Sequence, residues 1–85
     1  MDKREIRAVL LEVMDSVAPG CLPDVVDDME DIREQMDLDS MDLLNIVAGL
    51  HERLGVDVPD SDIEQISTIE GAVAYLSRHM QGDAE

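Results

Sequence analysis

Apolar residues recur at helical spacing in three stretches of the chain, and this pattern most limits the fold. In residues 2–17, apolar positions separated by three or four alternate with charged ones, which predicts an amphipathic helix that ends at Pro19 and Gly20. A second helix is predicted from Ser40 to a stop at Gly55, and a third begins near Ile69. The apolar positions are Ile6, Val9, Leu10, Val13 and Val17; Leu43, Leu44, Ile46, Val47, Leu50 and Leu54; and Ile69, Ala72, Val73, Leu76 and Met80.

Shorter elements are expected between these helices. Asp60, Ser61 and Asp62 offer capping groups for a brief turn through Ile66, and Ser67 with Glu70 matches a capping box. A structureless connection from the first helix to Asp39 would be unusually long. Within it, the spacing of Val25, Met29, Ile32 and Met36 predicts one or two helical turns across the core.

No strand pair, internal repeat or heptad array competes with this pattern. We therefore predict an all-α fold, a small three- to four-helix bundle with a long first loop and a short third helix. It forms a single free-standing domain over residues 1–85, with its core at about 3–80 and a frayed tail at 81–85. The core must be aliphatic, because the chain has no Trp, no Phe and only Tyr75.

The formal net charge of −15 repels nucleic acid and anionic membranes and attracts basic protein patches. Acidic residues concentrate before and just after Ser40, and this region is either a solvated face or a docking surface. They are Asp24, Asp27, Asp28, Glu30, Asp31, Glu34, Asp37, Asp39 and Asp42, opposed only by Arg33. With no signal peptide or membrane-spanning run, we expect a cytoplasmic protein that binds no nucleic acid and does not insert stably into membranes.

Residues suited to catalysis or metal binding are few, so we expect no enzyme. His51 and His79 are the only histidines, and both are predicted to be exposed. Cys21 has no cysteine to pair with and is interpreted as an incidental thiol. The aspartates near Ser40 do not form an EF-hand, because Asp42 and Ala48 stand where that loop needs glycine and glutamate.

Ser40 lies immediately before the apolar run of the second helix. It is either an N-cap, a role that Asp39 fills equally well, or a free hydroxyl at a helix start. A helix start carries partial positive charge and unsatisfied N–H donors, which suit a phosphate ester. If Asp39 is the cap, Ser40 is free to be modified.

The segment "DLDSMDLLNIVAGLHERLGVDVPDSDIEQISTIEGAVAYL" resembles the second half of an acyl carrier protein. With the first helix and long loop, the resemblance covers roughly residues 3–80. It implies a bundle of acyl-carrier type in which a phosphopantetheinyl transferase adds 4′-phosphopantetheine from coenzyme A to Ser40. The arm's thiol would hold an acyl or aminoacyl group as a thioester, so that the protein is a carrier and separate enzymes do the chemistry.

The resemblance also implies a monomer that docks on basic patches of its loading and processing enzymes, for which Asp39, Met41, Asp42 and Glu52 are the candidate contacts. Asn45, His51 and Arg53 interrupt the glutamates common in fatty-acid carriers, and Met36-Asp37-Leu38 replaces the usual Leu-Gly approach to the serine. Gly49 serves either close helix packing or room for an acyl chain. The identity of the cargo stays open. Two rival hypotheses also stay open: an unmodified acidic adaptor in which Ser40 only caps the helix, and a carrier fold that has lost its modification.

Overall fold

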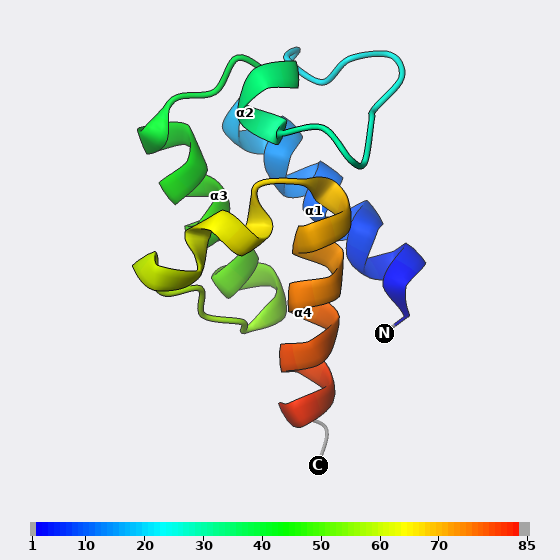
Figure 1. The fold of residues 1–85 in the computed structure, drawn as a ribbon, viewed down its shortest axis with the longest axis vertical. Coiled ribbons are helices and arrows are strands. Elements are labelled where there is room, and N and C mark those ends of the chain that lie inside the picture. Colours follow the sequence, from blue (N-terminus) through cyan, green and yellow to red (C-terminus); the bar gives the residue numbers. More distant parts are fainter. Residues whose placement is uncertain (1, 84–85) are drawn as a thin grey trace.

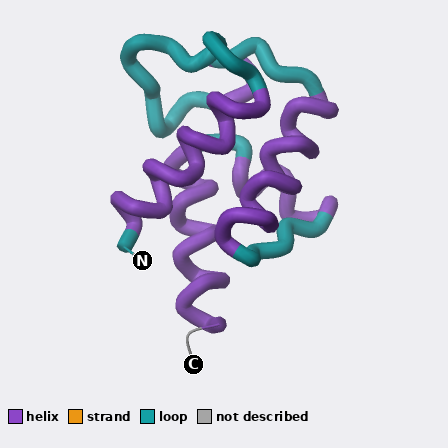
Figure 2. Tube along the Cα trace, turned by 180° about the vertical axis from the view of Figure 1, so that it is seen from behind, coloured by secondary structure: helices purple, strands orange, loops and turns teal. Residues whose placement is uncertain are grey.

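The computed structural model describes residues 2–83, with residues 81–83 described by their backbone alone. Five helical elements follow one another (Figures 1 and 2): α1 (Lys3–Val17), α2 (Ile32–Gln35), α3 (Ser40–Leu54), the 3-10 helix η1 (Asp60–Ile66) and α4 (Ile69–Asp83). Within residues 2–83, the only β-type pairing is an isolated bridge between Asp31 and Thr68. The predicted all-α bundle with a long first loop is confirmed.

The core lies among the three long helices. Helix α1 packs against both α3 and α4, and η1 packs against α4. The buried apolar residues among those described are aliphatic except for Tyr75, as predicted: they include Ile6, Leu10 and Met14 from α1, Leu43, Ile46 and Leu50 from α3, and Ile69, Ala72 and Leu76 from α4. One continuous apolar cluster thus joins all three helices.

Both ends of helices α1 and α3 follow from local sequence. Asp2 caps α1 in a capping box with Glu5, and the chain leaves that helix at Ala18. Helix α3 ends at Gly55, whose φ of 71° lies in the left-handed region that glycine adopts without a Cβ penalty. The predicted bounds of α3 are therefore confirmed, and those of α1 are confirmed except that Asp2 is the cap and Lys3 the first helical residue.

The predicted capping box of Ser67 with Glu70 is wrong. Helix α4 begins at Ile69, and Thr68 Oγ1 accepts the N–H of Gly71 at 3.0 Å. Ser67 instead ends η1, where its hydroxyl donates to the carbonyl of Glu64 at 2.9 Å. The carbonyl of Ser67 accepts the N–H of Ile32 at 2.8 Å, so a tertiary contact ties it to α2.

The capping groups expected for η1 are not used either. Pro59 precedes η1, and no side chain caps it. Asp62, which we expected to offer a cap, accepts the hydroxyl of Tyr75 at 2.6 Å instead. This carboxylate therefore joins η1 to α4.

The helical turns expected in the long connection are only partly present. Asp31 caps α2 by accepting the N–H of Arg33 at 2.8 Å, so the helix begins at Ile32 and lasts about one turn. Ile32 and Met36 are buried in the core, as their spacing predicted. Val25 and Met29 precede the cap and point to solvent, with exposed fractions of 86% and 66%.

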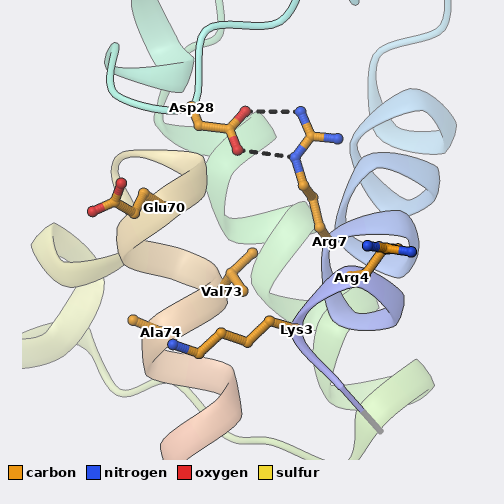
Figure 3. A pocket seen from close by; sticks show the side chains of 7 residues that line it. All are labelled: Lys3, Arg4, Arg7, Asp28, Glu70, Val73 and Ala74. Atoms are coloured by element: carbon orange, nitrogen blue, oxygen red, sulfur yellow. Dashed lines mark hydrogen bonds and ion pairs between the residues drawn. The ribbon is translucent and has the colours of Figure 1, made fainter.

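Asp28 attaches the middle of this connection to two helices. Its carboxylate accepts hydrogen bonds from Arg7 Nε at 2.9 Å and Nη2 at 2.8 Å (Figure 3), and its carbonyl accepts the N–H of Glu70 at 2.9 Å. The hydrogen bond from Arg7 lowers the pKa of Asp28 and raises the pKa of Arg7. The long loop is thereby joined to α1 and α4.

Helix α4 continues through Asp83, into the segment from Gln81 that we expected to fray. Ala84 and Glu85 of that predicted tail lie outside the described residues.

Gly49 lies where α3 crosses α1. A Cβ at this position would lie 2.7 Å from Val13 Cγ1, which is closer than two carbon atoms can pack. Valine has restricted χ1 freedom and cannot easily turn away. The geometry supports the packing role of Gly49 over the role of leaving room for cargo.

Gly49→Ala is expected to lower the free energy of unfolding. Overpacking costs about 1–3 kcal/mol, and the higher helix propensity of alanine offsets about 1 kcal/mol of that loss. In a Val13→Ala background the clash is gone, and the same substitution should be neutral or stabilising. Urea denaturation of the four variants in this cycle measures the coupling, and equal effects in both backgrounds would contradict the close contact.

Tyr75 joins α4 to η1 and is the only aromatic residue of the chain apart from the histidines. It is buried, its ring centroid lies 4.1 Å from that of His79, and its hydroxyl donates to Asp62. Burial and, secondly, the hydrogen bond to the Asp62 carboxylate raise the pKa of Tyr75 to about 12. Since the unfolded value is about 10, this residue stabilises the fold below pH 10 and loses that contribution as the pH rises toward 12.

Phenolate absorbance should report the titration of this residue directly, because the chain has a single tyrosine. We expect a midpoint near pH 12 in the folded protein and about pH 10 in denaturant. Asp62→Asn should lower the folded midpoint, since it removes a negative charge that opposes ionisation. Equal midpoints in the folded and denatured protein would show that the phenol is not buried in solution.

Candidate functional site

Helix α3 begins with a capping box made by two aspartates. Asp39 Oδ1 accepts the N–H of Asp42 at 2.9 Å, and Asp42 Oδ2 accepts the N–H of Asp39 at 3.4 Å. The N-cap is therefore Asp39, and Ser40 is the first residue of the helix. The structure thus decides between the two candidate caps that the sequence offered.

The Ser40 side chain is exposed at this helix start. Its hydroxyl makes no hydrogen bond to any residue in the part of the chain that the structure describes. The cap uses the N–H of Asp42, and the N–H of Leu43 bonds to the carbonyl of Asp39 at 3.1 Å. The N–H groups of the first two helical residues, Ser40 and Met41, are the donors that a helix start leaves for an anion.

The approach to Ser40 is held by the residues before it. Asp37 has a φ of 55°, a left-handed conformation that aspartate tolerates better than most residues. Leu38 follows with its N–H bonded to the carbonyl of Arg33 at 2.9 Å and its side chain against the core. Met36 is buried beneath this turn. No sequence signal predicted the left-handed backbone of Asp37.

Apolar side chains next to Ser40 face solvent. Met41 is 65% exposed and Leu44, one turn after Ser40, is 47% exposed. From its spacing, Leu44 was expected among the apolar positions of α3 that face the core, and this expectation is wrong. The apolar positions of α3 span a wider face than the one that the other helices cover. Leu44 is thus a surface residue that the sequence interpretation missed.

The structure brings together three of the four predicted contact residues. Asp39, Met41 and Asp42 flank Ser40, with Asp42 half-buried by its role in the cap. Glu52 is exposed but lies about 18 Å farther along α3, at a rise of 1.5 Å per residue. The site is therefore compact at the helix start, and Glu52 lies at a distance from it.

The other candidate groups lie outside this site. His51 and His79 are exposed, and so is Cys21. Among the described residues, no group of three or more histidines, cysteines or carboxylates is arranged to hold a metal ion.

Surface cavities lie away from the hydroxyl of Ser40. One of about 460 Å³ opens between α1 and α4 (Figure 3), lined by Lys3, Arg4, Arg7, Asp28, Glu70, Val73 and Ala74. Another of about 360 Å³ lies between α1 and α3 around Gly49. Neither is lined by Ser40 or by the residues of its capping box.

Comparisons with known proteins decide the family. The family profile of the phosphopantetheine attachment site matches residues 4–76. The acyl carrier protein of Campylobacter hominis is 36% identical over 72 residues, 85% of each chain, and that of Renibacterium salmoninarum is 30% identical over 73 residues, 86% of this chain and 89% of its own. The acyl carrier protein of Zymomonas mobilis is 33% identical over 60 residues, 71% of this chain and 77% of its own.

This chain belongs to the acyl carrier protein family. It is a carrier that bears 4′-phosphopantetheine, and it is not an enzyme. Membership in the family implies interaction with a phosphopantetheinyl transferase and with biosynthetic enzymes. In residues 2–83, no helix combines the length and the apolar character needed to cross a bilayer.

Replacing the cap tests how the site is built. Asp39→Ala should lower the free energy of unfolding by about 1 kcal/mol, because the N–H of Asp42 loses its acceptor. Asp39→Asn is the matched control, since it removes the same charge and keeps a capping oxygen. Urea denaturation compares the two variants. Equal stability would indicate that Ser40 takes over as the cap, as the adaptor hypothesis requires.

Proposed function

We propose that Ser40 is the residue to which the 4′-phosphopantetheine arm is attached. The observation that carries this proposal is an exposed hydroxyl, free of hydrogen bonds to the described residues, directly after a cap made by its neighbour Asp39. Capping and attachment therefore make no competing demand on the same oxygen. Family membership supplies the arm, and Ser40 lies within the matched segment.

The groups around Ser40 suit an attached phosphate. The N–H groups of Ser40 and Met41 and the positive end of the α3 dipole favour an anion at this position. Asp39 and Asp42 would repel it, but each of their carboxylates already accepts a backbone N–H at the helix start. When attached, the arm supplies a thiol that holds the cargo as a thioester. The protein's own residues position and present it.

We further propose that partner enzymes contact the exposed residues around this helix start. Asp39 and Asp42 supply negative charge to basic patches, and the exposed side chains of Met41 and Leu44 supply apolar contact next to the arm. Glu52 extends this charged face along α3. Loading and processing enzymes in the cytoplasm would use the same face in turn, and short-lived, salt-sensitive complexes suit such a shuttle.

Mass spectrometry tests the attachment site. Incubation with coenzyme A, Mg²⁺ and a broad-specificity phosphopantetheinyl transferase should add one phosphopantetheine to the intact protein. Ser40→Ala should abolish the addition while circular dichroism shows unchanged helicity. Ser61→Ala, another exposed serine at a helix start, is the matched control and should be modified like the wild type.

Two outcomes would contradict the proposal. Modification of the Ser40→Ala variant would place the arm on another residue. An unmodified wild-type protein, under conditions in which a known acyl carrier protein is modified, would favour the adaptor or a carrier fold that has lost modification.

A further inference from the structure

Large exposed apolar side chains occur at two places in the described part of the chain. Met41 and Leu44 belong to the Ser40 site, but Val25 and Met29 lie in the long connection. Both are more exposed than any other large apolar side chain in residues 2–80, at 86% and 66%. We call residues 24–30 the loop surface. The proposed function does not account for it.

Neighbouring apolar residues show that this exposure is selective. Leu22 and Val26 are partly buried against the core, so the connection does contribute apolar side chains to the interior. Val25 and Met29 point the other way, into water, although single exposed apolar residues are common on protein surfaces. The two residues lie four positions apart in the same connection and gain no burial there, so both side chains are available for contact with another molecule.

Hydrogen bonds hold residues 27–30 of the loop surface in one conformation. Gln35 Nε2 donates to the carbonyls of Asp27 at 2.7 Å and Glu30 at 3.0 Å, and Gln35 Oε1 accepts the N–H of Asp27 at 3.1 Å. Asp27 Oδ1 accepts the N–H of Met29 at 2.9 Å. The pair of Asp28 with Arg7 fixes the centre of the turn. Met29 is therefore presented by an ordered backbone, which reduces the entropy lost on binding.

Charge determines the kind of partner that fits. Asp24, Asp27 and Glu30 are exposed around the two apolar side chains, and the chain as a whole carries −15. A second copy would bring the same negative charge, and nucleic acids and anionic membranes are repelled as well. A protein surface with an apolar hollow rimmed by lysine and arginine is complementary to both features.

We propose that the loop surface is a docking site for such a basic, apolar protein partner, separate from the Ser40 site. Figures 1 and 2 show the connection on the α1 side of the bundle and the start of α3 on the other side, with α2 between them. The loop surface and Ser40 therefore belong to different elements. Binding at the loop surface does not require the arm, so unmodified and modified protein bind alike. The sulfur-containing side chain of Met29 adapts to differently shaped hollows.

Titrations followed by NMR test this proposal with a defined probe. An amphipathic helical peptide of lysine and leucine should shift the amide resonances of residues 24–30, whereas a lysine and serine peptide of equal charge should bind these amides much more weakly. Val25→Ser with Met29→Gln should weaken the peptide's affinity for the loop surface by at least about fivefold. Both side chains are exposed, so circular dichroism should show an intact fold.

The matched control is Met41→Gln with Leu44→Ser, which alters the apolar residues beside Ser40 and should leave binding at residues 24–30 unchanged. Shifts confined to α3 in the wild-type protein would overturn the proposal. So would an unchanged affinity in the Val25→Ser, Met29→Gln variant, or equal binding of the two peptides. Because no arm is needed, the result is independent of whether Ser40 is modified.

Discussion

The capping box of Asp39 and Asp42 fixes where helix α3 begins, and the site depends on that position. Asp39 Oδ1 accepts the N–H of Asp42, so Ser40 is the first helical residue and the cap does not use its oxygen. If Ser40 were the cap, its oxygen would be bonded to the backbone. The rotation of α3 about its axis is set by packing, because Leu43, Ile46 and Leu50 fill the core. The cap and the packing together leave the apolar face inward and the hydroxyl exposed.

The domain carries a formal charge of −15, and two of its arginines pair with carboxylates of the long connection. Arg7 of helix α1 pairs with Asp28 of the long connection. Arg33 of helix α2 pairs with Asp31, the residue that caps α2. The hydrogen bonds from these guanidinium groups lower the pKa of both carboxyls. Their stabilisation is therefore present above the unfolded value of about 4 and is lost as the pH falls further. Each pair is partly exposed and contributes little energy, so its main effect is to fix the position of the loop.

The sequence predicted those elements whose ends are determined locally. It failed where contacts with residues distant in the sequence determine which side chains are buried and which residue caps a helix. Asp2 and Gly55 mark the ends of α1 and α3 by themselves, and the residues around Ser40 identify the site in one short segment. Val25 and Met29 have the same spacing as Ile32 and Met36, yet only the second pair is buried, because the cap at Asp31 and the bond from Arg7 to Asp28 set the path of the chain. Ser67 and Thr68 both offer a capping hydroxyl in sequence. Thr68 caps α4, whereas the hydroxyl of Ser67 donates to the carbonyl of Glu64 and its carbonyl accepts the N–H of Ile32.

Attachment of the long connection to α1 and α4 has a consequence for how partners are recognised. Asp28 holds the loop surface on the α1 side of the bundle, while the cap holds Ser40 at the start of α3. In this arrangement, the contact that selects a partner and the contact that reaches the arm are made by different elements. Substitutions in residues 24–30 can then change which proteins bind without altering the geometry at Ser40, because no core residue of α3 depends on the exposed side chains of that turn.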